Sequence, residues 1–235
     1  MNRILVAWCV SSTIFCWGAR EVRAQAVVTD GRFTNVYVYP GPSKETWDEH
    51  LTKLPANQKP KNWEKFTRKL IDEYTQTLMS TSWPSYFSGL KQYGINPPQF
   101  FGGYIASQSC VDAAIRDAHN GIVAATSLRS LANCHIDGMD TSPQVNLILS
   151  PDMKVAEGAV VSNGPDICGE SGNHTVAYHG AGLNVPNYSV MPTARGCAPN
   201  FGAFTANLSH EIVEIVTDPA LLGHGGIPSG NELGD

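Results

Sequence analysis

Residues 209–219, Ser-His-Glu-Ile-Val-Glu-Ile-Val-Thr-Asp-Pro, hold the side chains best suited to chemistry. His210 and Glu214 are four residues apart, so on a helix both side chains lie on one face, one turn apart. One metal ion could bind both. Glu211 could then reach a metal-bound water and act as the general base, as the glutamate of a His-Glu-x-x-His helix does. The spacing therefore predicts a zinc site.

A third ligand must come from outside this pair, because a catalytic zinc normally takes three protein ligands and keeps one position for water. Glu232 follows Glu214 by eighteen residues, a separation that lets the chain turn and bring a carboxylate back to the helix. Asp218, one turn farther along the same face, is an alternative ligand or a partner that orients a ligand. Weaker candidates for these roles are His224 and Asp235.

A buried polar network is the alternative interpretation of the same residues. His-Glu-x-x-Glu is common on solvated helix faces, so the pattern alone does not establish a metal site. The positions between the ionisable residues are apolar, namely Ile212, Val213, Ile215 and Val216. Ionisable groups on such a helix are costly to bury unless they are paired or bound to metal. A nearby lysine or arginine would indicate ion pairing, and Arg195 is the closest in sequence.

Other candidate ligands have less support. His174 and His179 are five residues apart around a predicted strand and should face opposite sides, so we interpret both as ordinary residues. A loop containing His135, Asp137 and Asp140 fits a solvated acidic turn better than a cation site, and its spacing is not that of a calcium loop. The chain has no Gly-rich phosphate loop, Gly-x-Ser-x-Gly elbow or cysteine-nucleophile signature, which excludes kinase, nucleotide-binding and serine-hydrolase interpretations.

The N-terminus has the layout of a secretory signal peptide. Arg3 precedes an apolar run over residues 4–17, and small-residue sites follow at Ala24 and Ala26. The run is shorter than the roughly 20 apolar residues of a spanning helix. We expect residues 1–24 to be a signal peptide and residues 25–235 to be a single secreted α/β domain, extracellular or periplasmic and not an integral membrane protein. The net charge of −5, without any basic stripe, argues against nucleic acid as a partner.

Four cysteines remain after removal of the leader, and an oxidising compartment favours two disulfides. Three pairings are possible, and the sequence does not decide among them. We expect Cys110 with Cys134 and Cys168 with Cys197, because each pair brackets one local unit. Their spacing is not Cys-x-x-Cys, so a cysteine zinc site or a thioredoxin-like motif has little support.

The two acidic motifs, residues 209–219 and Asn231-Glu-Leu-Gly-Asp235, resemble a group of secreted microbial proteins related to the exordium-type, phosphate-induced proteins of plants. The hallmark of that group is a His-Glu-x-x-Glu helix ending in Thr-Asp-Pro or Ser-Asp-Pro, followed by an Asn-Glu-Ile-Gly-Asp-like segment. By analogy with the gluzincin peptidases, the resemblance implies that Glu232 is the third ligand. Glu214 departs from the second histidine of those peptidases, and a carboxylate there makes a zinc-bound water a weaker acid.

The elements that must position these residues alternate between strands and helices. Periodicity and turn signals predict strands at 35–39, 100–106, 144–149, 176–178 and 188–191, and helices at 62–79, 110–119 and 122–134. The last helix is expected to begin with Thr205 or Asn207 as its N-cap and to stop by Pro219. This order predicts an α/β (or α+β) fold, a mixed sheet flanked by helices, with a zincin-like order and a C-terminal metal-site helix.

The apolar positions of the 62–79 helix recur at helical spacing, so we expect them to be core contacts. These positions are Trp63, Phe66, Leu70, Ile71, Tyr74 and Leu78.

Together these features predict a secreted zinc-dependent hydrolase of peptidase type, acting on a peptide or a cell-wall-associated substrate. His210, Glu214 and Glu232 are the predicted zinc ligands, and Glu211 is the predicted base. The alternative is a non-catalytic secreted or cell-wall-associated binding protein, in which the same residues form a structural metal site or a polar cluster.

Overall fold

The computed structural model describes residues 31–40, 51, 54–93, 95–116, 118, 120–134, 144–156, 166–169, 177–182 and 185–217. These residues contain a five-stranded sheet in the order β2-β1-β4-β7-β6. Its strands are β1 (Arg32–Val38), β2 (Gln99–Ile105), β4 (Gln144–Leu149), β6 (Tyr178–Gly182) and β7 (Val185–Pro192). The first four in spatial order run parallel, and β6 runs antiparallel to β7. A parallel two-stranded pair joins β3 (Ile122–Val123) to β5 (Lys154–Val155).

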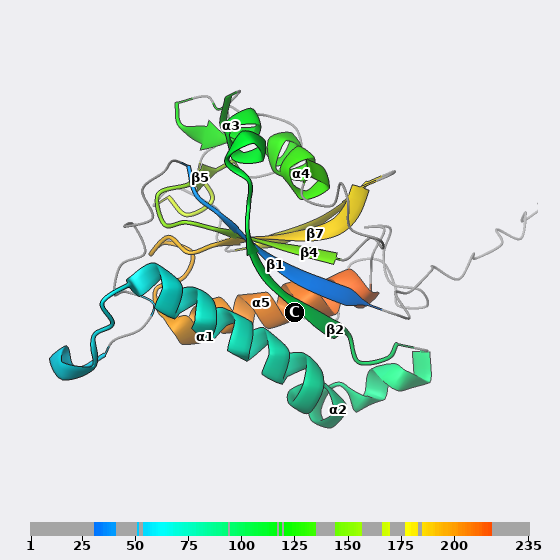
Figure 1. Ribbon diagram of the computed structural model, residues 1–235. Coiled ribbons are helices and arrows are strands. Elements are labelled where there is room, and N and C mark those ends of the chain that lie inside the picture. Colours follow the sequence, from blue (N-terminus) through cyan, green and yellow to red (C-terminus); the bar gives the residue numbers. More distant parts are fainter. Residues whose placement is uncertain are drawn as a thin grey trace, which may run out of the picture.

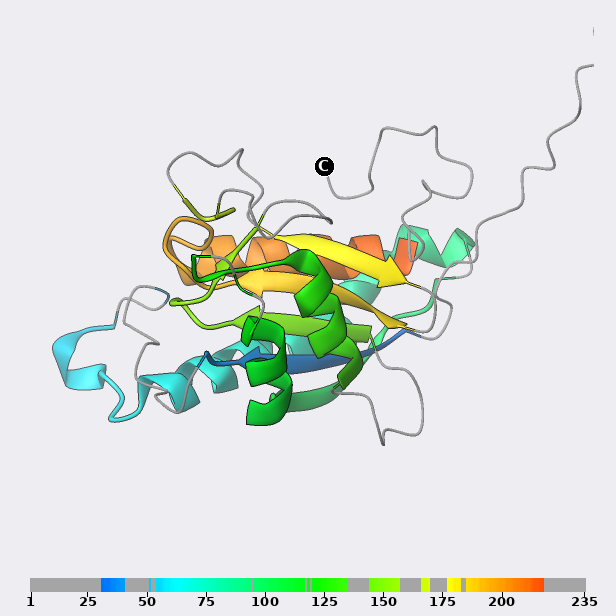
Figure 2. The same cartoon turned by 90° about the horizontal axis from the view of Figure 1, so that it is seen from above.

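Helices cover both faces of the sheet (Figure 1). One face carries α1 (Trp63–Thr77), α2 (Trp83–Tyr86) and α5 (Phe201–Thr217), and the other carries α3 (Gln108–Arg116) and α4 (Ala125–Cys134). Figure 2 looks onto the second face, with α3 and α4 in front of the strands. The expected α/β fold, a mixed sheet flanked by helices, is therefore confirmed. Within the described residues, none of the helices combines the length and the apolar character that crossing a bilayer requires.

Shorter helical segments link these elements. They are the 3₁₀ turns η1 (Ala56–Gln58) and η3 (Ser88–Tyr93) and the π-helical stretch η2 (Leu78–Ser82). The stretch η2 connects α1 directly to α2, whose first turn contains Pro84. A proline is tolerated there because the first N–H groups of a helix have no intrahelical acceptor. Trp83-Pro84 thus forms the start of a helix.

Alternation along the strands divides the interior into two cores. On β1, Phe33 and Tyr37 face the core beneath α1 and α5, whereas Val36 and Val38 face the core beneath α3 and α4. All four side chains are fully buried. Successive strand residues point to opposite faces of the sheet, and helices cover both faces. The side chains of a central parallel strand are therefore buried on both sides.

The helix α1 confirms the predicted segment, and Asn62 caps it by accepting a hydrogen bond from the Lys65 amide at 2.8 Å. The set of residues that is buried, however, differs from the predicted set. Ile71 and Leu78 are buried as expected, whereas the other four predicted contacts are only partly buried, namely Trp63, Phe66, Leu70 and Tyr74.

Polar residues of α1 instead occupy buried positions that face the sheet. The fully buried positions include Glu64, Thr67 and Thr75. Glu64 accepts a hydrogen bond from the Tyr39 hydroxyl at 2.7 Å, and Thr75 accepts one from the Asn35 amide at 3.1 Å. Hydrogen bonds from Tyr39 and Asn35 therefore offset the cost of burying Glu64 and Thr75.

The starts of two other helices also differ from expectation. The last helix begins at Phe201, about one turn before the predicted caps, because Asn200 Oδ1 accepts a hydrogen bond from the Ala203 amide at 2.9 Å. The predicted helical stretch 122–134 begins with the strand β3, and its helix α4 starts only at Ala125.

Two disulfides join the pairs that we expected. Cys110–Cys134 links α3 to α4, with 6.1 Å between the Cα atoms. Cys168–Cys197 ties the turn at residues 166–169 to the segment before α5, with 4.9 Å between the Cα atoms. Both bonds fit a protein that folds in an oxidising compartment.

Candidate metal centre

The C-terminal half of α5 is enclosed on all sides. Every residue from Glu211 to Thr217 is buried, and Glu211 and Glu214 are each only 3% exposed. The two carboxylates are three residues apart and therefore lie on adjacent parts of one helix face. Buried carboxylates need a charged or hydrogen-bonding partner, because desolvation is otherwise too costly.

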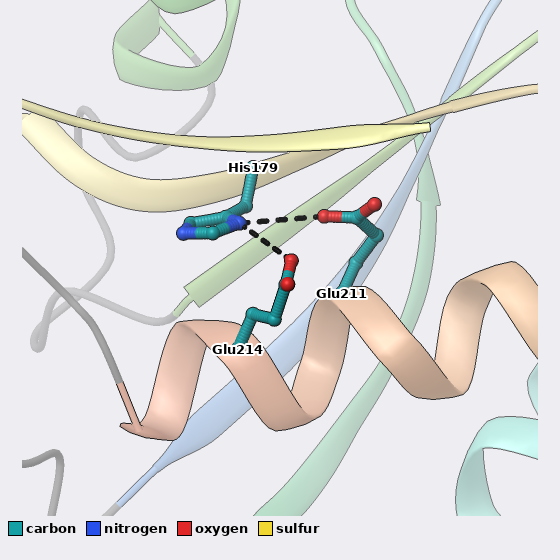
Figure 3. Close-up of side chains that lie close together, drawn as sticks. All are labelled: His179, Glu211 and Glu214. Atoms are coloured by element: carbon teal, nitrogen blue, oxygen red, sulfur yellow. Dashed lines mark hydrogen bonds and ion pairs between the residues drawn. The ribbon is translucent and has the colours of Figure 1, made fainter. Parts of the chain in front are cut away.

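The strand β6 supplies that partner, His179 (Figure 3). Its Nδ1 atom lies 2.9 Å from Glu214 Oε2 and 3.5 Å from Glu211 Oε2. Although β6 is an edge strand, the His179 side chain is only 7% exposed, because it points from the sheet toward α5. One ligand atom from each of these three residues lies within 4.8 Å of the other two, so the group could hold a metal ion.

His210 approaches the group from its solvent side. Its Nε2 atom lies 3.1 Å from Glu214 Oε1, and its side chain is 30% exposed. The contact follows the i, i+4 spacing that the sequence indicated. The Glu214 carboxylate thus lies between two imidazoles, with His179 on one oxygen and His210 on the other.

The electrostatics of the group favour a cation. Burial alone would lower the pKa of His179, but its close contacts with the Glu211 and Glu214 carboxylates and their negative charges raise it to about 9. Burial raises the pKa of Glu211, the close contact with His179 opposes this shift, and the Glu214 charge raises the pKa further. Two buried carboxylates therefore share one protonated imidazole, a role that a metal ion could take over by displacing the proton.

Hydrogen-bonding capacity at the group is incompletely used. Within the described residues, His179 Nε2 and Glu211 Oε2 are buried and have no hydrogen-bond partner. Unsatisfied ionisable groups are rare in protein interiors, and an ion or a bound ligand is a common explanation for them.

The donor set suits zinc and similar divalent ions, which bind imidazole nitrogen and carboxylate oxygen. Ligand bonds of about 2.1 Å in a tetrahedral site place neighbouring ligand atoms about 3.4 Å apart. The distances from Glu214 to His179 and His210 are 2.9 and 3.1 Å. Each imidazole is therefore close enough to the Glu214 oxygen that it contacts to share a metal ion with it.

No family model, curated protein or solved structure matches this chain. The resemblance to exordium-related proteins accordingly stays a prediction, and the chemistry of the site has to be argued from its geometry.

The structure brings His210, Glu211 and Glu214 together on α5, next to a residue that the sequence interpretation set aside. The view of His179 as an ordinary residue is wrong, because it contacts both carboxylates. The predicted strand ended at residue 178, so His179 was not placed beside the strand at 188–191. A lysine or arginine beside the carboxylates would have indicated the alternative, an ion-paired network; in the structure His179 lies at that position.

The remaining candidates lie outside the described residues. These are His135, Asp137, Asp140, His174, Asp218, His224, Glu232 and Asp235. The assignment of Glu232 as third ligand, and of Asp218 or Asp235 as an alternative ligand or orienting partner, stays a prediction.

Proposed function

We propose that this protein is a secreted, zinc-dependent hydrolase of the peptidase type. The observation that carries the proposal is the convergence of two carboxylates of α5, each 3% exposed, on one buried imidazole nitrogen of β6. The two disulfides support export to an oxidising compartment.

In this proposal His179 Nδ1, His210 Nε2 and a Glu214 oxygen hold the zinc ion. Two imidazoles and one carboxylate form a ligand set that is common in catalytic zinc sites. His179 then completes the three ligands without Glu232. When bound, zinc would polarise a substrate carbonyl and lower the pKa of a coordinated water. His210, the most exposed of the three, marks the side from which a substrate would approach.

Glu211 is the proposed general base. Its Oε2 atom lies beside the ligands, 3.5 Å from His179 Nδ1, and makes no hydrogen bond within the described residues. Burial raises its pKa, which makes the carboxylate a stronger base near neutral pH. Glu211 would take a proton from the attacking water and pass it to the leaving amine.

A non-catalytic metal site is the second candidate, and the position of Glu211 favours it. Its carboxylate converges with His179 and Glu214 within 4.8 Å, so Glu211 could itself be a ligand. A site of His179, Glu211 and Glu214 would be almost closed to solvent, as structural metal sites are.

The variant Glu211→Gln separates the two candidates. If Glu211 is the base, the variant keeps stoichiometric zinc, measured by mass spectrometry, and loses at least about 100-fold in peptide hydrolysis. If Glu211 is a ligand, zinc is lost as well. Glu73→Gln is the matched control, because its 59%-exposed side chain lies on α1 and its replacement should change neither quantity. A wild-type protein that binds no zinc, or a Glu211→Gln variant with full activity, would refute the hydrolase proposal.

A further inference from the structure

A row of polar side chains crosses the sheet on the face covered by α1 and α5. The strand register pairs Asn35 of β1 with Asn146 of β4, and Asn146 with Ser189 of β7. Ser189 in turn pairs with His179 of β6. Residues at paired positions point to the same face of a sheet. Asn35, Asn146 and Ser189 are all 0% exposed, so a buried polar row leads to the candidate metal centre.

Hydrogen bonds run through this row in one direction. The Ser189 hydroxyl donates to Asn146 Oδ1 at 2.9 Å, and the Asn146 amide donates to Asn35 Oδ1 at 3.0 Å. The Asn35 amide donates to Asp72 Oδ1 on α1 at 2.8 Å. An ionised carboxylate only accepts hydrogen bonds, so Asp72 fixes the orientation of each amide and of the hydroxyl.

The far end of the row is shaped to hold this carboxylate. Gly103 of β2 pairs with Asn35, and a Cβ atom at Gly103 would collide with the Asp72 carboxylate. The Tyr37 hydroxyl also donates to Asp72 Oδ1, at 2.7 Å. A missing side chain and a second donor thus keep the carboxylate at the end of the row.

The direction of the hydrogen bonds matters at the other end. The Ser189 hydroxyl donates its one hydrogen to Asn146, so the lone pairs of the Ser189 oxygen remain beside β6. The aligned dipoles place their negative end next to His179, where they favour a cation. No hydrogen bond joins the Ser189 hydroxyl to the His179 ring in the part of the chain that the structure describes. The row therefore acts on His179 through the pairing of β6 with β7 and through the dipoles of its side chains.

We infer that Asn35, Asn146 and Ser189 are positioning residues for the candidate metal centre: they hold His179 in place and stabilise a metal cation bound there. The inference rests on the proposed function, because it assigns His179 as a metal ligand.

The first test removes the hydroxyl at the end of the row. Titration with Co²⁺, followed by its visible absorption, should show an affinity about tenfold weaker in Ser189→Ala than in wild type, the lower end of the effect of groups that support metal ligands. Ser189→Thr, which restores a hydroxyl, should recover the affinity. The matched control is Thr193→Val, since Thr193 directly follows β7 and is equally buried but donates to the Leu149 carbonyl at 2.7 Å. Equal Co²⁺ affinity of wild type and Ser189→Ala would overturn the inference.

The second test changes the opposite end of the row and does not depend on how well Ser189→Ala folds. Asp72→Asn removes the charge that orients the row, and we expect a Co²⁺ affinity about threefold weaker. Glu73→Gln removes the same charge from the neighbouring, exposed position. Asn35 and His179 are three strand spacings apart, about 14 Å, beyond the Debye length of about 10 Å at 0.1 M salt. Equal losses in both variants would show a general charge effect and overturn the role of the row.

A third measurement needs no metal. The ¹⁵N signals of the His179 imidazole in metal-free protein should shift in Ser189→Ala and stay in place in Thr193→Val. Unchanged signals in Ser189→Ala would overturn the positioning role. Failure of wild type to bind either Co²⁺ or Zn²⁺ would refute the proposed function and the cation-stabilising part of the inference, whereas the imidazole signals alone would decide the positioning part.

Discussion

Two buried polar clusters lie on the same face of the sheet and differ in how fully their hydrogen bonds are made. Under α1, the Asp72 carboxylate accepts from the Asn35 amide and the Tyr37 hydroxyl. Next to α5, two carboxylates compete for the single Nδ1 atom of His179. In the first cluster two donors serve one carboxylate, whereas in the second one imidazole nitrogen lies between two carboxylates.

This difference in hydrogen bonding distinguishes a structural cluster from a candidate binding site. Polar groups that satisfy one another offset their desolvation and fix the packing of strands and helices. In the second cluster, two ionisable side chains each keep an atom without a hydrogen bond among the described residues. Among the described residues, buried hydroxyls such as that of Thr67 also lack a hydrogen-bond partner, but the group whose ligand atoms lie within 4.8 Å of one another consists of His179, Glu211 and Glu214. Convergence of charge, together with unmet bonds, is what indicates a ligand.

The largest expected effect is the loss of metal affinity on removal of His179. Zinc binding at structural sites is worth roughly 10–16 kcal/mol over four ligands, so one ligand accounts for about 4 kcal/mol, or about 1,000-fold in affinity. Isothermal titration of His179→Ala with Zn²⁺ should show this loss. Near-normal zinc affinity of His179→Ala would mean that the cluster next to α5 is not the metal site, so that both clusters are structural.

The second prediction concerns the stability of the metal-free protein with pH. The pKa of His179 is about 9 in the folded protein and about 6.5 in an unfolded chain, so its contribution is complete below pH 6.5 and disappears as pH rises through 9. The raised pKa of Glu211 acts in the same direction, because its ionisation at higher pH disfavours the fold. Urea unfolding should show a loss on the order of 3 kcal/mol over this range. If the free energy of unfolding of a His179→Ala variant fell equally steeply with pH, the assignment of this loss to His179 would be contradicted.

The third prediction addresses the cluster under α1. Tyr37→Phe removes one donor to Asp72, and we expect the free energy of unfolding to fall by about 1–2 kcal/mol in urea denaturation. Zinc affinity should stay within about twofold of wild type, because Asn35 still donates to the carboxylate. A large change in zinc affinity would show that the Tyr37 hydroxyl, and not only the Asp72 charge, supports the metal centre.

The smallest expected effect has the opposite sign. Glu211→Gln relieves the crowding of two buried carboxylates, so metal-free protein at neutral pH should become more stable by about 1 kcal/mol. Thermal unfolding with a chelator present would measure it. A destabilised Glu211→Gln variant would indicate that the second cluster, like the first, is already satisfied.

Local patterns in the sequence were enough for several features. Helical spacing placed His210, Glu211 and Glu214 together, because the relation between residues three or four apart is fixed by the geometry of one helix. The order of strands and helices indicated the α/β fold, and the disulfide pairing was expected from the local units that the cysteines bracket. The start of α5 was misplaced, because Thr205 and Asn207, which lie inside the helix, are also residue types that cap helices.

Only the tertiary structure decided which residues complete the site. His179 reaches Glu214 because β6 turns back antiparallel along β7, and the row of Asn35, Asn146 and Ser189 exists because three parallel strands adopt one register. The row joins side chains that are 111 and 43 residues apart in sequence. Strand order and register follow from the packing of the whole sheet between its helices, so no short stretch of sequence encodes which distant side chains will meet.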